Sequence, residues 1–156
     1  MSNYKTEITL RGHHLLCLQG YQGYGYSEDF KKNIENILYK LENKNTIVSI
    51  TNSKDELCKH CPNLKNNLCT LGEDSPNIKI EDIKSNNHKV VKMDNIVIKK
   101  GNIHLNNNYN IHHLYDIVNE KFKYKKQANE VCGDCIWKKH CLWYQSRRAY
   151  SDKNSV

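Results

Sequence analysis

The spacing of the cysteines is the feature that most constrains this chain. Two segments have the same form, Cys58-x2-Cys61-x7-Cys69 and Cys132-x2-Cys135-x5-Cys141. In each segment a tight turn can direct two thiolates at one centre, while the third cysteine closes over it from a few residues away. Isolated buried cysteines behave as small hydrophobic residues, but the repeated spacing disfavours that interpretation. The sequence therefore predicts a small, cysteine-rich, metal-binding domain.

The cysteines are not expected to form a disulfide framework. The N-terminal stretch MSNYKTEITL has neither the apolar run nor the cleavage site of a signal peptide, which predicts a cytoplasmic, reducing location. The count of seven is odd, so complete pairing within one chain is impossible. No run approaches the roughly 18 apolar residues of a membrane span. The length of 156 residues fits one domain, residues 1–156, without membrane contact.

The spacing is compatible with two kinds of metal centre. The two C-x2-C pairs could form one tetrahedral zinc site, as in zinc ribbons. Iron–sulfur clusters also take four thiolates, tolerate irregular spacing and can recruit a remote cysteine or a histidine. A zinc ribbon would leave three cysteines without a role: Cys17, Cys69 and Cys141. We therefore favour one or two 4Fe-4S clusters, with zinc as the alternative.

The stretch RGHHLLC adds three candidate ligands. On a helix, His13 and His14 lie four and three residues before Cys17, so either can share its face. Two four-ligand sites need eight ligands and the chain has seven cysteines, so one histidine would complete the set. The alternative for each histidine is a hydrogen-bonded role beside the ligands or in the core. The competitors inside the two triplets are His60 and His140.

Hydrophobic periodicity predicts an α+β fold that is predominantly helical, with little regular sheet. The clearest helix begins at the N-cap Ser27 and runs to about Glu42, with apolar residues at helical spacing. The β-branched, alternating residues 46–51 predict a short strand. Residues 82–105 fit either strands or a buried helix, because the periodicity is ambiguous there.

Three local signals position the remaining elements. Ser53 and Glu56 resemble a capping box that opens a short helical turn leading to Cys58. Asn110 is expected to cap a helix with one apolar face. After a tight turn at Gly133, the chain is expected to become helical again.

The basic character of the chain is a weak indication of nucleic-acid binding. The net charge is +7, but most lysines are spread among asparagines along the whole length, which favours a compositional bias over a dedicated binding face. Only the stretch KFKYKK at 121–126 and the pair Arg147 and Arg148 are dense enough for phosphate contacts. The Gly/Tyr-rich residues 20–26 are expected to cover the metal centre or the core; the alternative is a substrate or partner pocket beside Arg11 and His13.

Three motifs occur in a distinctive order: LRGHHLLCLQGYQGYGYS, then CKHCPNLKNNLC, then CGDCIWKKHC. This order resembles a family of small bacterial and archaeal proteins of unknown function with an N-terminal Arg-x-His-His-Leu-Leu-Cys motif. The resemblance covers most of the chain, except the asparagine-rich middle. It implies iron–sulfur binding but no particular reaction. The residues that it carries over are Arg11, His13, His14, Cys17, Cys58, Cys61, Cys69, Cys132, Cys135 and Cys141.

We expect an iron–sulfur protein that acts in electron transfer with a redox partner protein or in cluster sensing. A second hypothesis is a zinc-stabilised nucleic-acid or partner-binding module that uses the basic stretches. A third is an enzyme with an open cluster iron and polar groups from Arg11, His13 and His14. No catalytic residue is assigned from the sequence.

Overall fold

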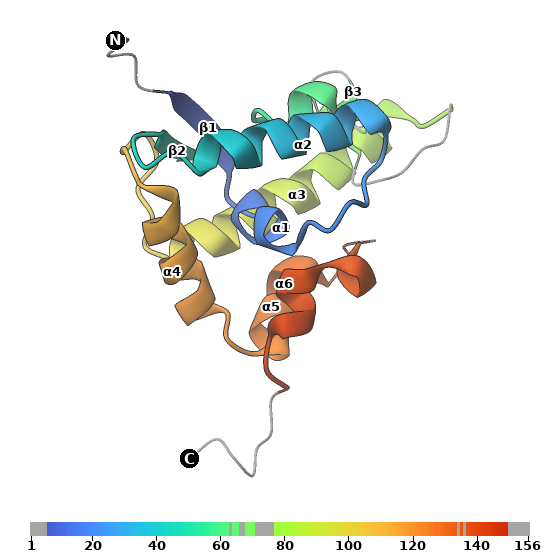
Figure 1. The fold of residues 1–156 in the computed structure, drawn as a ribbon. Helices are drawn as coiled ribbons and strands as arrows, with labels where there is room; N and C mark the ends of the chain where they lie inside the picture. The colour runs from blue at the N-terminus through green and yellow to red at the C-terminus, as the bar shows by residue number, and fades with distance from the viewer. Residues whose placement is uncertain are drawn as a thin grey trace.

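The computed structural model describes residues 6–62, 64–65, 68–70, 77–133, 135 and 137–149. Helices dominate these residues, and the strands form two small two-stranded sheets (Figure 1). The predicted α+β, predominantly helical fold is therefore confirmed. The elements are β1 (Glu7–Arg11), α1 (His14–Gly20), α2 (Glu28–Leu41), β2 (Ile47–Thr51), η1 (Cys58–His60), β3 (Leu64–Lys65), β4 (Leu68–Cys69), α3 (Ile80–Lys100), α4 (Ile111–Lys121), α5 (Lys125–Cys132), η2 (Lys138–His140) and α6 (Leu142–Ser146).

The predicted first helix and strand are both confirmed. The Ser27 hydroxyl accepts a hydrogen bond from the Phe30 amide, which caps the N-terminus of α2. Strand β2 pairs in parallel with β1, from Glu7 opposite Ile47 to the end of both strands. Because parallel strands need a crossover connection, α1 and α2 together span the distance between the two strands. This arrangement places α1 directly after the end of β1.

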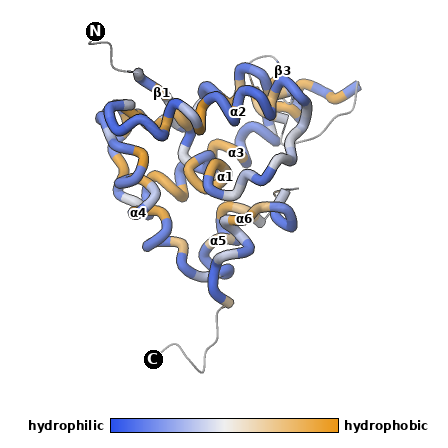
Figure 2. The backbone as a smooth tube through the Cα atoms, viewed as in Figure 1, coloured by the Kyte–Doolittle hydropathy of each residue, from blue (hydrophilic) through white to orange (hydrophobic). Residues whose placement is uncertain are grey.

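The ambiguous stretch after residue 82 is a single helix, α3. Its buried residues are Ile83, Val90, Met93, Asp94 and Val97, which recur at intervals of three, four and seven. The β-branched residues there favour strands locally, but this spacing forms one continuous stripe only on a helix. The stripe faces the interior, so α3 forms one wall of the core (Figure 2).

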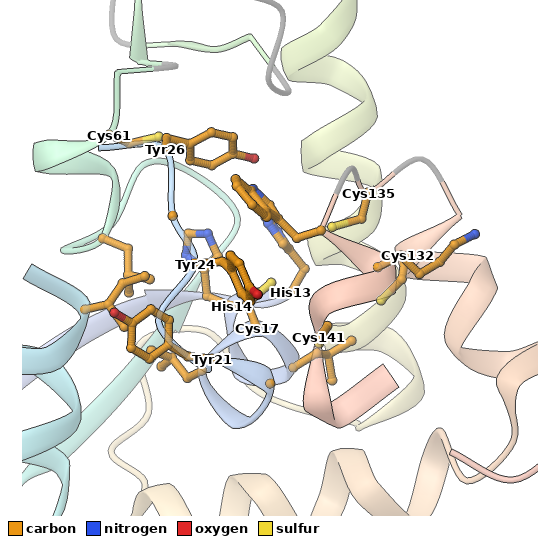
Figure 3. A pocket seen from close by; sticks show the side chains of 18 of the residues that line it. His13, His14, Cys17, Tyr21, Tyr24, Tyr26, Cys61, Cys132, Cys135 and Cys141 are labelled. Carbon is orange, nitrogen blue, oxygen red and sulfur yellow. The ribbon is translucent and has the colours of Figure 1, made fainter. Parts of the chain in front are cut away.

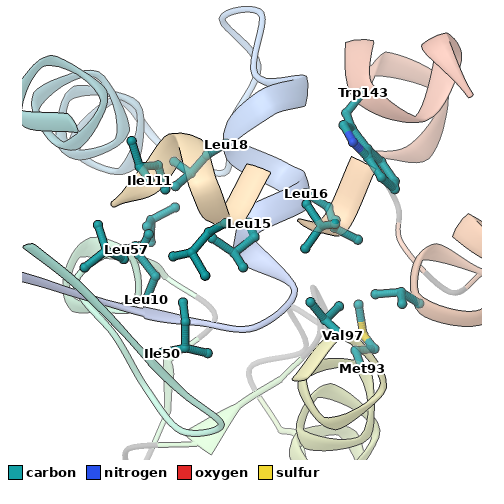
Figure 4. Packing of buried hydrophobic residues seen from close by; sticks show 14 of the residues in the cluster. Leu10, Leu15, Leu16, Leu18, Ile50, Leu57, Met93, Val97, Ile111 and Trp143 are labelled. Atoms are coloured by element: carbon teal, nitrogen blue, oxygen red, sulfur yellow. The ribbon is translucent and has the colours of Figure 1, made fainter. Parts of the chain in front are cut away.

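Helix α1 lies in the centre of the hydrophobic core. Leu15 and Leu16 have exposed fractions of 0% and 1%. Figure 4 shows Leu15 beside Leu10 of β1, and Leu16 directed toward Trp143 of α6. This short helix is therefore apolar on most of its surface. Because packing of its leucines fixes the orientation of α1, it also fixes where the polar residues of this helix point.

The capping prediction at Ser53 is wrong, although a helical turn does lead to Cys58. The Ser53 hydroxyl pairs with the Thr51 hydroxyl at 3.0 Å. Asp55 caps the turn instead, because its Oδ1 accepts from the amides of Leu57 and Cys58 at 3.0 and 3.1 Å. A carboxylate placed inside the turn reaches these amides more directly than a serine two residues earlier.

The other two local predictions are confirmed. The Asn110 side chain accepts a hydrogen bond from the His112 amide at 2.9 Å and caps α4. Gly133 ends α5, and the chain returns to helical structure in η2 and α6.

Candidate metal centre

A cavity of about 150 Å³ lies between α1, the Tyr21–Tyr26 loop, η1 and the segment that precedes α6 (Figure 3). The seven cysteines and both histidines predicted as candidate ligands line it. All seven cysteines are described, and all are free thiols. Segments more than a hundred residues apart in the sequence therefore contribute sulfur atoms to the same space.

The C-terminal cysteine triplet, Cys132, Cys135 and Cys141, lines one part of the cavity. Cys132 ends α5, and the Cys135 amide donates to its carbonyl oxygen at 3.0 Å, which closes the C-x2-C turn. Cys141 is the N-cap of α6, and its sulfur accepts a hydrogen bond from the Tyr144 amide at 3.5 Å. Amide donors to sulfur stabilise the thiolate form that binds metals.

Cys17 lies against this triplet. A Cβ atom at Gly20, one turn further along α1, would overlap Sγ of Cys141, so glycine allows α1 and α6 to pack closely. Burial raises the pKa of the Cys17 thiol well above its usual range, and the negative charges of nearby Cys135, Cys132 and Cys141 raise it further. We call Cys17, Cys132, Cys135 and Cys141 the cysteine quartet.

The buried thiols are poor nucleophiles in the metal-free protein. Burial raises the pKa of Cys58 to about 12 and that of Cys132 to about 12. Reactive cysteines have the opposite property, a lowered pKa next to positive charge. A bound metal ion supplies that positive charge and deprotonates the thiols that bind it. The arrangement therefore suits metal ligation better than thiol catalysis.

The N-terminal triplet, Cys58, Cys61 and Cys69, lies on another side of the cavity. The Cys61 amide donates to the Cys58 carbonyl oxygen at 3.1 Å, a turn like that of the second C-x2-C pair. Strands β3 and β4 pair Leu64 with Cys69, so the hairpin brings Cys69 back toward Cys61. The Cys69 amide donates to Oδ1 of Asn87 at 2.9 Å, which fixes the hairpin to α3.

Among the residues that the structure describes, one group of side chains satisfies the distance requirement for a single metal ion. The potential ligand atoms of His14, Asp55 and Cys58 all lie within 4.8 Å of one another. Nδ1 of His14 is 2.6 Å from Oδ2 of Asp55, and the Arg11 amide donates to the same oxygen at 2.7 Å. The structure therefore contains a possible metal-binding site at these three residues.

His13 makes a parallel arrangement with Asp94 of α3. Its Nδ1 is 2.6 Å from Oδ1 of Asp94, and Nε of Arg11 donates to Oδ2 at 2.8 Å. Asp94 is fully buried and Arg11 is 2% exposed. A Cβ at Gly12 would lie only 2.7 Å from the Asp94 carbonyl oxygen, so glycine permits this close approach of β1 to α3.

Burial and neighbouring charges keep His13 neutral and Asp94 ionised. Burial lowers the pKa of His13, which keeps its ring neutral at pH 7 despite the nearby carboxylate. Burial opposes ionisation of Asp94, but His13 and Arg11 hold the pKa of its carboxyl below the usual range. Each histidine thus has Nδ1 fixed by a carboxylate, which leaves Nε2 as the nitrogen available to a ligand.

Sequence reasoning missed Asp55 and Asp94. A signal for Asp94 was present, because it is an acidic residue within an otherwise apolar helical stripe between Val90 and Val97. A buried carboxylate in such a stripe indicates a paired or functional group. Asp55 lies between Ser53 and Glu56, the two residues of the predicted capping box, and the prediction assigned the cap to Ser53 instead.

The tyrosine-rich loop covers part of the cavity. The Tyr26 ring meets the Trp137 ring edge-on at 5.2 Å, and the Tyr24 ring lies 4.8 Å from the His140 ring. Nε2 of Gln22 donates to the His140 carbonyl oxygen at 2.6 Å. These contacts connect the tyrosine-rich loop with the segment that carries the C-terminal triplet. His60 and His140 are both exposed, but only His140 is among the residues that line the cavity.

Arg147, one of the basic residues considered for phosphate contacts, has a structural role. Its guanidinium lies 4.7 Å from the centre of the Trp143 ring. Nη1 also donates to the carbonyl oxygens of Asn119 and Phe122 at 3.5 and 3.4 Å.

Among the described residues, no helix has both the length and the apolarity needed to cross a bilayer.

Comparison with known proteins gives a family without an assigned function. Residues 25–141 match the family model "Protein of unknown function (DUF1284)". The match includes both cysteine triplets but begins after the segment that carries His13, His14 and Cys17. No match was found among curated proteins or among solved structures. Because the match spans about three quarters of the sequence, the chain belongs to the DUF1284 family of proteins of unknown function.

Proposed function

We propose that this protein binds a 4Fe-4S cluster through the cysteine quartet and acts in electron transfer or in cluster sensing. The observation that carries the proposal is the position of Cys17, whose buried thiol lies with the three thiols of the C-terminal triplet. A 4Fe-4S cluster takes four cysteine thiolates and accepts irregular spacing, including one remote cysteine. When bound, the cluster would supply one-electron chemistry.

The space beside the sulfur atoms supports a cluster rather than a single zinc ion in the quartet. Zinc–sulfur bonds are about 2.3 Å long, so four thiolates close tightly around one ion. Here the thiols line a cavity of about 150 Å³, which a multi-atom cluster fills better than one ion does. The partial or full burial of these cysteines and the Tyr26–Trp137 contact limit access of water, and water access is one determinant of cluster potential.

Metal analysis of anaerobically purified protein tests the proposal. We expect about four iron and about four acid-labile sulfide per chain, brown colour and a paramagnetic signal after reduction. Cys17→Ser and Cys132→Ser should each lose most of the iron. Glu130→Ser is the matched control on α5, because its side chain is exposed and should leave the iron content unchanged.

Two outcomes would contradict parts of this proposal. Full iron in Cys17→Ser would remove Cys17 from the ligand set. Zinc without sulfide in the parent protein would contradict the cluster and favour the zinc-stabilised module.

A further inference from the structure

The excess positive charge of the chain is concentrated in the segment that carries the C-terminal cysteine triplet. Lysines are spread along the sequence, but acidic residues are not. Residues 121–149 contain six lysines and two arginines but only one glutamate and one aspartate, so their formal charge is +6. The whole chain carries +7, which leaves +1 for all other residues. The basicity of this protein is therefore a property of one segment.

The fold gathers basic side chains of this segment around Tyr144 of α6. The ammonium groups of Lys125 and Lys138 lie 5.9 and 5.6 Å from the centre of the Tyr144 ring. The Lys125 amide donates to the Arg148 carbonyl oxygen at 2.8 Å, which joins the start of α5 to the chain after α6. The Arg148 amide donates in turn to the Lys123 carbonyl oxygen at 2.9 Å. We call Lys123, Lys125, Lys138, Lys139 and Arg148 the basic patch.

Most of the charge of the basic patch is not neutralised by the residues around it. Nζ of Lys138 donates to Oδ1 of Asn129 and to the Gly133 carbonyl oxygen, both at 3.4 Å, and both acceptors are neutral. Lys123 is paired with Glu120 at 3.0 Å. Lys139 and Arg148 are exposed. The patch therefore presents a positive surface to the solvent.

This positive surface borders the cysteine quartet. Lys138 and Tyr144 line the same cavity as the four cysteines. The Tyr144 amide donates to Sγ of Cys141 at 3.5 Å, and η2, which carries Lys138 and Lys139, ends directly before Cys141. A protein bound to the patch would therefore lie close to the sulfur atoms of the quartet.

The residues of this surface suit a protein partner better than a single-stranded nucleic acid. Proteins that bind single strands offer exposed aromatic rings on which bases stack. Here two ammonium groups lie over the half-buried Tyr144 ring, and Trp143 is buried beneath the Arg147 guanidinium. Leu142, which follows Cys141, is 50% exposed. Exposed apolar area beside a charged rim is typical of protein interfaces.

We propose that the basic patch is the docking surface for an acidic one-electron carrier protein. The inference rests on the proposed function, because the carrier needs the cluster in the quartet as its redox partner. One electron passes from the reduced carrier to the oxidised cluster, and no bond is formed or broken. Opposite charges on the two surfaces speed their encounter and orient the carrier, and salt screens this attraction.

Calorimetric titration with a plant-type 2Fe-2S ferredoxin, an acidic one-electron carrier, tests the docking surface. Both proteins are oxidised, so association is measured without electron transfer and does not depend on their potentials. We expect the Kd to rise by about tenfold or more when NaCl is raised from about 20 to about 300 mM. Lys139→Glu/Arg148→Glu should raise the Kd at low salt by about tenfold or more, because like charges then face the carrier.

Stopped-flow mixing of the reduced ferredoxin with the oxidised protein gives the second measurement. The bimolecular rate constant should fall with salt and should fall in Lys139→Glu/Arg148→Glu. Cytochrome c, a basic carrier, provides the reverse case. Its reaction with the reduced protein should be slow at low salt and should accelerate as salt screens the repulsion.

Lys40→Glu/Lys44→Glu is the matched control, because it makes the same change in net charge at two exposed positions. Figure 1 shows α2, which carries Lys40, on the other side of α1 from α6. This variant should bind the ferredoxin within about twofold of the wild type, since charges farther apart than a Debye length are largely screened. Both double variants should keep the iron content of the wild type.

The outcomes separate this inference from the proposed function. Equal loss of ferredoxin binding in both double variants, or salt-independent binding, would overturn the docking surface while an iron–sulfur cluster remains. Tight binding of single-stranded DNA that only the patch variant loses, without ferredoxin binding, would overturn it in favour of a nucleic-acid surface. Salt-dependent ferredoxin binding that needs the patch, in a protein without iron or sulfide, would support the surface for an acidic protein while the cluster proposal fails.

Discussion

At the scale of single residues, Arg11 connects the two sides of the buried polar network. Its amide holds Asp55 and its guanidinium holds Asp94, and each aspartate fixes one of two adjacent histidines. Removing one member leaves an uncompensated charge in the interior, which typically costs about 3–5 kcal/mol. The network is therefore expected to matter for the stability of the fold as well as for the orientation of the rings.

Asp94→Asn should lower the free energy of unfolding by about 3–5 kcal/mol at pH 7, because Arg11 loses its counter-charge. It should also change the pH dependence. The pKa of Asp94 is lower in the folded protein than the value of about 3.9 in an unfolded chain, so the unfolded state binds protons more readily. The stabilisation from this group is fully present above about pH 5 and is lost progressively as the pH falls below about 4, through the lower pKa of the folded protein.

Urea unfolding between pH 7 and pH 3 measures this effect. The parent should lose stability more steeply than Asp94→Asn over that interval, and taking the difference between the two removes what the other carboxylates and the histidines contribute. Asp82→Asn, an exposed substitution on the same helix, should follow the parent. Equal slopes for parent and Asp94→Asn would show that the carboxyl is not held ionised by the fold.

The sequence revealed the cysteines and histidines but not the aspartates that position the histidines. Spacing identifies Cys58 and Cys61 because a C-x2-C turn is local. The partners of His13 and His14 are set by tertiary contacts over 81 and 41 residues, which no local pattern encodes. Carboxylates are also common on surfaces, so a buried one is distinguished only when its face is known.

At the scale of elements, α1 is the piece on which the cavity depends. It has seven residues, and Leu15, Leu16 and Leu18 on it are buried in the core while Cys17 lines the cavity. An isolated helix of this length is unstable in water, so tertiary packing must hold it. Its C-terminal residue, Gly20, sets how closely α6 can approach.

Gly20→Ala should disrupt the cluster site even though alanine favours a helix more than glycine does. Its new Cβ would overlap Sγ of Cys141 and lie 3.1 Å from the Trp143 amide nitrogen, so α6 must move away from α1. We expect at least half of the iron to be lost, measured by iron and sulfide content and visible absorbance.

Gly23→Ala is the informative control for this prediction. Its Cβ would meet nothing within 4 Å, but the φ of +97° disfavours alanine. It should therefore cost about 1 kcal/mol of stability while keeping the iron. If both variants retain the iron of the wild type, the contact between α1 and α6 does not control the site.

The elements that could be predicted are those whose sequence signals are local. Helix α2 has a serine cap, acidic residues in its first turn and a clear apolar stripe, so it was found to within a residue or two. Helix α3 combines strand-favouring Val90, Val91 and Val97 with a helical stripe, and only the packing of that stripe decides between them.

At the scale of the whole molecule, the cavity adjoins the hydrophobic core, because Leu16, Leu57 and Met93 belong to the core and also line the cavity. The core joins β1, β2, α2 and α4 through apolar contacts, whereas the cavity wall includes two cysteine-bearing segments with short or irregular structure. Such segments bury few apolar side chains, so metal ligation is expected to supply much of their order.

Metal removal should therefore act unevenly along the chain. Anaerobic chelation is expected to increase amide hydrogen exchange strongly around Cys58, Cys69, Cys132 and Cys141, by at least tenfold, because these segments lose the metal that their cysteines bind. Helix α2 and strand β2 should change much less, since apolar packing holds them. Hydrogen exchange with mass spectrometry measures both regions in one sample. Equal protection with and without metal would show that the metal is an accessory to a preformed fold.

The wide sequence separation of the cavity's sulfur atoms has a consequence for biosynthesis. The quartet brings Cys17 together with Cys141, so it closes only after nearly the whole of the sequence from α1 to α6 has left the ribosome. Translation proceeds at about 5–20 residues per second, so Cys17 waits on the order of ten seconds with no partner thiols from α5 and α6. During that interval the growing chain carries unprotected thiols, and iron delivered early would meet an incomplete set of ligands. At the proposed cluster site, loading would therefore follow the synthesis of α6 rather than accompany that of α1.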